Sequence, residues 1–133
     1  MCVFCKIIAG EIPATKVFEN ESVFAFLDIN PIEKGHLLVV PKRHCEFLEE
    51  APPDDLCELI SAVQKLTRAV RTFASGANVM QNNGKSAGQE VPHLHFHVIP
   101  RYGTIPFTWK SGAAKYGSDA ERDEFAGKIK AVI

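Results

Sequence analysis

The segment His93-Leu94-His95-Phe96-His97-Val98-Ile99-Pro100 decides the fold of this chain. Histidine and apolar residues alternate in it, and an alternation of period two predicts a β-strand over residues 93–100. Successive side chains of a strand point to opposite faces, so the three histidines share one face with α-carbons roughly 6.6 Å apart. The apolar residues between them face the core. Three neighbouring imidazoles predict a chemical site, because imidazole serves as nucleophile, as acid or base and as metal ligand.

The three histidines alone leave two other interpretations open. One is a polar strand face that happens to be rich in histidine, although exposed strand faces favour threonine and other β-formers. The other is a metal site in which His93, His95 and His97 act together as ligands. Such a site would need further acidic or histidine ligands nearby.

Outside this segment the sequence predicts an antiparallel α+β sheet. Five strands are expected, over residues 16–19, 22–27, 36–41, 78–82 and 93–100. The third of them is apolar at consecutive positions, as in a strand covered on both faces. The strands follow one another in meander order with helices inserted, which favours antiparallel pairing. We find no repeat or linker, and 133 residues suit one domain over residues 1–133.

Two main helices are expected. The first begins at Pro52-Pro53, has Gly76 as its stop and shows one apolar stripe at three- and four-residue spacing. The stripe consists of Leu56, Leu59, Ile60, Val63, Leu66, Val70 and Phe73. The second follows Ser118, which forms a capping-box signal with Glu121. Its apolar side is expected to contain Phe125, Ile129 and Val132.

The composition bounds the class of partner. With 46% hydrophobic residues and a formal net charge of −1, the chain can form a core but has no general attraction for nucleic acid or anionic membranes. The apolar runs are too short for a membrane span, and the first residues lack the features of a secretory signal. We therefore expect a cytoplasmic protein with no nucleic-acid or membrane partner, whose cysteines are thiols or metal ligands.

Together with its flanks, the triple histidine resembles the signature of the histidine-triad (HIT) family. The family pattern has three histidines separated by single apolar residues, two more apolar residues after them, and Gly-Gln a few positions upstream, here Gly88-Gln89. The resemblance covers about residues 2–102 and is carried by the stretches 4–13, 25–31, 35–42 and 82–100. It implies the HIT fold, an antiparallel five-stranded sheet with two main helices that pairs into a homodimer.

The resemblance also implies an activity, which is hydrolysis or transfer at the α-phosphate of a purine nucleotide conjugate. The middle histidine, His95, would attack phosphorus and form a covalent nucleotidyl-histidine that water resolves. His97 would bind the phosphate and help the leaving group, and His36 would position the triad. The positions that match substrate-binding residues are Asp28 for the ribose, Ile29 beside the base, and Asn82, Gly88 and Gln89 on the phosphate side.

Elementary chemistry agrees with parts of this assignment. Gly84 and Gly88 would let backbone amides approach an anion closely. Considered alone, Asp28 suits a strand-ending turn as well as a ligand, and His36 is typical of a hydrogen-bonded core histidine. Glu90 departs from the pattern, because several family members carry Ser or Thr there to assist the leaving group. A carboxylate at this position would accept a proton or repel an anionic leaving group.

The cysteine pair Cys2-Val3-Phe4-Cys5 is weak evidence by itself, because a redox motif or coincidence explains it equally well. Some HIT proteins that resemble this one bind zinc through this pair, a histidine at the position of His44 and the first triad histidine, here His93. All four residues are present. A filled four-ligand shell would make the Zn²⁺ structural and leave His95 free.

Two substrate branches of the family and two other functions compete. The amino-terminal cysteines and the motifs that resemble the Hint branch of the family favour a nucleoside phosphoramidate hydrolase. A dinucleoside polyphosphate hydrolase is the alternative. A nucleotide-binding regulator without turnover would need no nucleophile. A metal-dependent hydrolase would lose activity in chelator and regain it with added metal.

Overall fold

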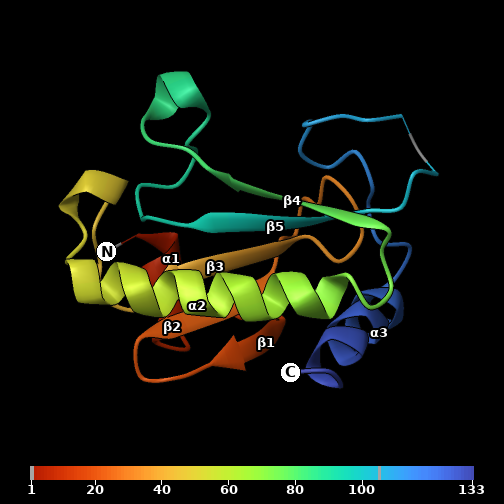
Figure 1. The fold of residues 1–133 in the computed structure, drawn as a ribbon, viewed down its shortest axis with the longest axis horizontal. Helices are drawn as coiled ribbons and strands as arrows, with labels where there is room; N and C mark the ends of the chain where they lie inside the picture. The colour runs from red at the N-terminus through yellow and green to blue at the C-terminus, as the bar shows by residue number, and fades with distance from the viewer. Residues whose placement is uncertain (1, 105) are drawn as a thin grey trace.

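Five antiparallel strands form one sheet in the order β1-β2-β3-β5-β4 in the computed structural model, which describes residues 2–104 and 106–133 (Figure 1). The strands are β1 (Lys16–Glu19), β2 (Val23–Leu27), β3 (Leu37–Pro41), β4 (Gly76–Gln81) and β5 (Phe96–Arg101). All five expected strands are present within a few residues of their predicted bounds. The strict meander order is wrong, because β5 lies between β3 and β4.

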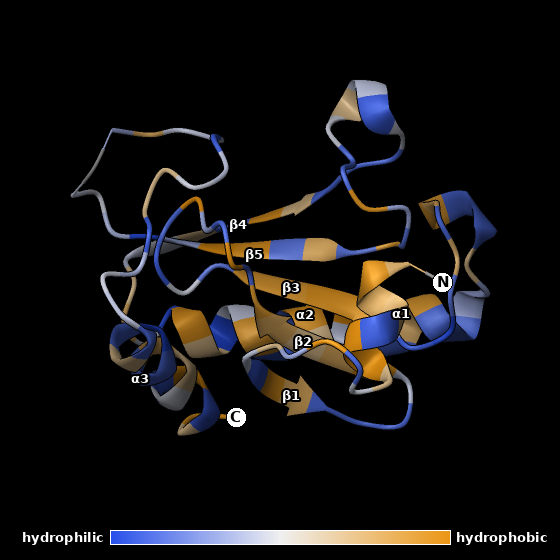
Figure 2. Cartoon of the chain, turned by 180° about the vertical axis from the view of Figure 1, so that it is seen from behind, coloured by the Kyte–Doolittle hydropathy of each residue, from blue (hydrophilic) through white to orange (hydrophobic). Residues whose placement is uncertain are grey.

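The helices lie on both faces of this sheet. They are α1 (Val3–Ile8), α2 (Pro53–Val70) and α3 (Asp119–Lys130), with 3₁₀ turns at η1 (Leu48–Glu50) and η2 (Lys85–Ala87). Figure 1 shows α2 running across one face, and Figure 2, from the opposite side, shows α1 on the other. The short helix α1 was not expected from the sequence.

α2 begins where Pro52-Pro53 predicts and buries most of its apolar stripe. Leu59, Leu66 and Val70 are fully buried against β2, β3 and β5, whereas Ile60 remains 48% exposed. The helix ends at Val70 with Arg71 as its carboxyl cap, and Gly76 begins β4. The expected stop at Gly76 is therefore wrong, because the chain turns back to the sheet five residues earlier.

The carboxyl-terminal helix follows its predicted cap. Ser118 Oγ accepts a hydrogen bond from Glu121 N–H at 3.1 Å, whereas the Glu121 carboxylate binds the N–H of Gly117 rather than that of Ser118. Ile129 is fully buried, but Val132 lies beyond the end of α3 and is 49% exposed. Val132 therefore does not belong to the apolar side of this helix, as was expected.

β3 is buried at all five positions, as its consecutive apolar residues predict. The α2 face is covered by the main core, whereas on the other face Leu38 and Val40 pack with Phe24, Phe26 and Phe4 of α1. Since α1 covers only part of this second face, the rest is left to form a cleft beside β5. Among the described residues, no helix combines the length and the apolar character needed to cross a membrane.

Candidate functional site

The three histidines line one side of the chain, although only His97 lies within β5. The ladder of β5 begins at Phe96, because its pairing with both β3 and β4 starts there. The predicted strand start at His93 is therefore three residues early. The alternation still holds, since Leu94 and Val98 are fully buried in the core under α2.

His95 presents one nitrogen without a proton. Its Nδ1 lies 2.7 Å from the carbonyl oxygen of His93, and a carbonyl oxygen can only accept, so Nδ1 carries the proton. In the neutral ring the lone pair is then on Nε2. The ring of Phe4 meets the His95 ring edge-on, with centroids 5.2 Å apart, and the side chain is 6% exposed. The arrangement presents a nucleophilic nitrogen on a fixed imidazole.

His36 and His97 form a second pair with assigned protons. The backbone N–H of Ile32 donates to His36 Nδ1 at 3.0 Å, so the proton of neutral His36 is on Nε2. That Nε2 lies 2.9 Å from His97 Nδ1 and donates to it. The proton of neutral His97 is therefore on Nε2, where His97 can donate to an oxygen. Its ring centroid is 5.0 Å from that of His95, so both rings serve one small group.

Burial keeps these imidazoles uncharged near neutral pH. Desolvation is the largest cause at each ring, lowering the pKa of His36 to about 3 and that of His97 to about 4. Neighbouring charges add to both shifts, from His97, Arg101 and His95 at His36, and from His95 at His97. Burial also lowers the pKa of His95, and the hydrogen bond to His93 and the charge of Glu90 offset this in part.

His95 and His97 open into a cleft of about 660 Å³ on the face of the sheet opposite α2. Its walls come from α1, the segment after β2, the loop between β4 and β5, and a segment at 109–111. Of the residues expected to bind substrate, Asp28, Ile29, Asn82, Gly88 and His97 line this cleft. The volume is that of a small-molecule site.

Asp28 and Ile29 stand at the end of β2. Asp28 Oδ1 accepts a hydrogen bond from Asn30 N–H at 2.8 Å, and Oδ2 lies 3.6 Å from His36 Nε2. Burial raises the pKa of Asp28 to about 6, the bond from Asn30 lowers it, and the charge of Glu90 raises it. Asp28 therefore closes a turn with one carboxylate oxygen and also lines the cleft. The neighbouring Ile29 is 82% exposed.

Gln89 is placed differently from the other expected substrate-binding residues. Its side chain is buried, accepting from Gly84 N–H at 2.7 Å and donating to the carbonyl of Glu46 at 2.8 Å. It therefore ties the loop to the segment after β3 and does not line the cleft. The N–H groups of Gly84, Gly88 and Gln89 all bond within the loop, so the glycines shape it through their positive φ.

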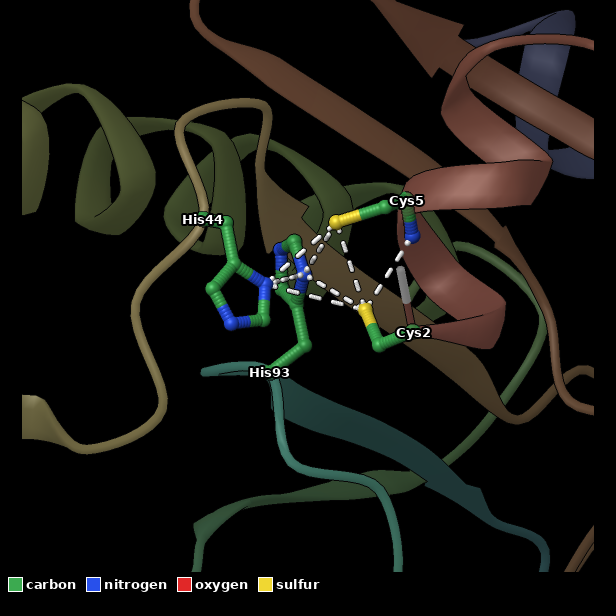
Figure 3. A group of neighbouring side chains, drawn as sticks. All are labelled: Cys2, Cys5, His44 and His93. Atoms are coloured by element: carbon green, nitrogen blue, oxygen red, sulfur yellow. Dashed lines mark hydrogen bonds between the residues drawn. The ribbon is translucent and has the colours of Figure 1, made fainter.

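Four side chains converge at the amino terminus, as Figure 3 shows for Cys2, Cys5, His44 and His93. The six distances among their Sγ and Nδ1 atoms lie between 3.1 and 3.7 Å. A tetrahedral zinc site with its usual bond lengths has ligand separations of about 3.3–3.8 Å. His93 Nε2 donates to the carbonyl of Pro41 at 2.8 Å, which turns the Nδ1 lone pair toward the cluster. The donor set suits Zn²⁺.

Asp28, His36 and His97 form another close group of ligand-type residues. It is unsuited to a metal, because the nitrogen of His36 that faces the group carries the proton given to His97. Within residues 2–104 and 106–133, the ligand atoms of His93, His95 and His97 do not converge on a common point. This disfavours the metal-dependent hydrolase.

The sequence did not assign the segment 109–111 or Phe4 to the site. Trp109, Lys110 and Ser111 line the cleft, and the bond from Gly112 N–H to the carbonyl of Asn30 anchors the segment beside Asp28. No local pattern predicts this contact, since it joins residues about 80 positions apart. A faint signal for Phe4 was its position between two candidate metal ligands.

Comparisons with known proteins identify the family. A model of the HIT domain matches residues 9–104. A HIT-like protein of Methanocaldococcus jannaschii is 50% identical over 131 residues, which cover 98% of this chain and 99% of that protein. An adenosine 5'-monophosphoramidase of Candida albicans is 44% identical over 106 residues, covering 75% of this chain and 70% of that protein.

A solved structure agrees with the fold. The Zn-bound histidine triad family protein from Mycobacterium smegmatis has a TM-score of 0.88 and 34% identity, covering 98% of this chain and 91% of that one. The family match, the fold and the triple histidine therefore agree, and the chain belongs to the HIT family.

Proposed function

We propose that this protein is a nucleotide hydrolase that cleaves nucleoside phosphoramidates at the α-phosphate through a covalent intermediate on His95. The observation that carries the proposal is the fixed tautomer of His95, whose Nε2 lone pair belongs to a ring in the cleft. Similarity to an adenosine 5'-monophosphoramidase supports a purine nucleotide conjugate with an amine leaving group.

The proposed reaction has two displacements at phosphorus. In the first, His95 Nε2 bonds to phosphorus, and the P–N bond to the leaving group breaks with its electron pair on the nitrogen, which has taken a proton from solvent. The proton stays on His95 Nδ1 and is donated in a hydrogen bond to the carbonyl of His93, which stabilises the positive charge that the ring acquires. In the second, water attacks phosphorus and gives a proton to solvent, and the bond between phosphorus and His95 Nε2 breaks, which releases the nucleotide and restores the neutral imidazole. His97 Nε2–H donates to a phosphoryl oxygen, held in that tautomer by His36.

Substrate binding is proposed at the residues that the cleft brings together. Asp28 would accept the ribose hydroxyls, with Ile29 against the base. Asn82, whose side chain has no hydrogen-bond partner among the described residues, would donate to the phosphate beside Gly88. Gln89 would act on the same side by holding the loop in shape, since both ends of its amide are engaged.

Zn²⁺ is proposed at Cys2, Cys5, His44 and His93. Bound there it supplies a structural crosslink, because four protein ligands fill a tetrahedral shell. His93 would join this shell to the carbonyl that holds His95. Metal analysis of protein purified without chelator should find about one zinc per chain, and an absence of zinc would refute this assignment.

A symmetric homodimer and a cytoplasmic location are also proposed. β4 forms an edge of the sheet, and Val79 on β4 and Ile60 on α2 are each 48% exposed. Such an apolar edge suits pairing with a second copy. The four free cysteines agree with a reducing compartment.

The decisive experiment assays adenosine phosphoramidate and diadenosine polyphosphates side by side with wild type and His95→Ala. We expect turnover of the phosphoramidate by wild type, loss of at least about 10³-fold in His95→Ala, and an intact-mass shift of one nucleotide that the variant lacks. Preferential turnover of the polyphosphates would support the alternative branch. Binding without turnover or mass shift would indicate a regulator.

A further inference from the structure

Glu90 is a carboxylate whose backbone is held on both sides. Before it, the buried Gln89 side chain bonds to Gly84 N–H and to the carbonyl of Glu46. After it, Val91 packs against the apolar cluster that contains Phe4, and the Val91 carbonyl accepts a hydrogen bond from His93 N–H at 2.8 Å. The Gln89 side chain thus turns away from the cleft, whereas Glu90 lines it together with His95.

The Glu90 side chain itself is exposed and unpaired. Within residues 2–104 and 106–133, no hydrogen bond or ion pair holds its carboxylate. Its charge nevertheless reaches the site, because it adds to burial in raising the pKa of Asp28. A free carboxylate fixed by its backbone at the cleft is available to a ligand.

The charges that line the cleft are unsuited to a polyanion. Asp28 and Glu90 are acidic, His95 and His97 are neutral, and Lys110 is the one permanent cation among the described lining residues. A nucleoside polyphosphate leaving group carries several negative charges, and like charges at close range repel. An amine leaving group adds no negative charge and offers N–H donors.

We propose that Glu90 determines the leaving-group specificity of this site, favouring amines, above all cationic ones, and opposing polyphosphates. This inference rests on the proposed function. In the favoured reaction the bridging nitrogen of the phosphoramidate takes a proton from solvent, and Glu90 accepts an N–H from it. His95 Nε2 then bonds to phosphorus, the P–N bond breaks with its electron pair on nitrogen, and the amine leaves neutral.

The test uses three adenosine 5'-phosphoramidates whose amine tails have equal length and end in an ammonium, a methyl or a carboxylate group. Diadenosine tetraphosphate is the fourth substrate. kcat/KM is measured for wild type, Glu90→Gln, Glu90→Ser and the control Glu124→Gln, whose carboxylate is exposed on α3. Ratios between substrates do not depend on the fraction of folded enzyme, so a partly misfolded variant remains informative.

In wild type we expect the ammonium-ended substrate to exceed the carboxylate-ended one by about tenfold, as one charge at close range in a partly screened site requires. Both Glu90 variants should bring this ratio close to one and raise the relative rate on diadenosine tetraphosphate, and Glu124→Gln should change neither. If all three phosphoramidates are cleaved but the Glu90 variants have the same ratios of kcat/KM between substrates as wild type, this inference is overturned and the proposed function stands. Failure of wild type to cleave any of them would overturn the proposed function as well.

Discussion

At the scale of single residues, three backbone groups decide which nitrogen of each histidine carries a proton. The carbonyl of Pro41 turns the lone pair of His93 toward the cysteines, the carbonyl of His93 leaves His95 Nε2 bare, and Ile32 N–H makes His36 a donor. The sequence singled out these histidines as candidate site residues. It could not predict their tautomers, because these depend on the backbone conformation that brings each group to its ring, which a pattern of residue types does not specify.

The donor role of His36 predicts different effects of two substitutions. His36→Leu removes the proton given to His97, frees the His97 tautomer, and should lower kcat by about 10²-fold with a smaller change in KM. His36→Gln keeps an N–H donor near the same place and should retain clearly more activity. Steady-state kinetics on adenosine phosphoramidate check this, and equal losses in both variants would show that packing alone matters.

The depressed pKa values of the buried imidazoles predict a loss of stability in acid. The unfolded chain binds a proton at each histidine below pH about 6.5, whereas folded His97 and His36 do so only near pH 4 and 3. Between these limits the unfolded state binds more protons, so the free energy of unfolding falls as pH falls, by up to about 1.4 kcal/mol per pH unit for each ring.

The titration of Asp28 changes the free energy of unfolding in the opposite direction. Its folded pKa of about 6 lies above its ordinary 3.8, so between these values the folded state holds the extra proton and stability rises as pH falls. Urea unfolding between pH 4.5 and 7.5 should therefore give a steeper pH dependence in Asp28→Asn and a shallower one in His36→Gln than in wild type. Parallel curves for all three proteins would contradict the assigned pKa shifts.

At the scale of elements, local patterns predicted the long pieces and missed those that depend on distant contacts. α2 and β3 each contain enough apolar residues for the local sequence pattern to predict them. α1 has six residues, too few for a stable isolated helix, and depends on Cys2 as its cap and on Phe4 against the sheet. β5 starts at Phe96 because its neighbours stop pairing there, which no pattern within residues 93–100 reveals.

Because α1 depends on the cluster, removing the metal should loosen it. With about one zinc bound, a strong chelator should lower Tm by about 8 °C or more, since a loss of about 2 kcal/mol has this effect in a domain of this size. Cys5→Ala should start from the lower Tm and not respond to chelator. Cys57→Ala, at an exposed site on α2, should behave as wild type in differential scanning fluorimetry.

A chelator response that survives in Cys5→Ala would place the metal elsewhere.

The same samples also test the structural role of the site. After chelation at a temperature where the protein stays folded, residual phosphoramidase activity should remain if the proposed mechanism holds, because in it His95, which is outside the cluster, attacks phosphorus without a metal. Complete loss of activity in folded protein would indicate a catalytic metal.

At the scale of the whole molecule, the two faces of the sheet differ in structure. The face opposite α2 contains the cleft, and the α2 face contains the main core. Beside that core, α2 and β4 leave a groove with Ile60 and Val79 at its walls. Val79 pairs with the buried Val98, so its side chain is on the α2 face and remains half exposed at the sheet edge.

This edge predicts the oligomeric state. Light scattering at assay concentration should give about twice the 14.7 kDa chain mass for wild type. Val79→Glu places a charge where two copies would meet and should give a folded monomer, because an exposed site tolerates the carboxylate in the single chain. Val132→Glu changes an equally exposed valine beyond α3 and should leave the dimer intact.

The comparison of these two valines makes the prediction specific to the edge of β4. A general loss of solubility or stability would affect both variants, whereas an interface at β4 and α2 responds only to the first. A wild-type chain that stays monomeric, or a Val79→Glu variant that stays dimeric, would exclude this edge as the interface. Ile60 and Val79 would then remain half exposed in the groove between α2 and β4, which Gln64, Arg68 and Arg71 also line.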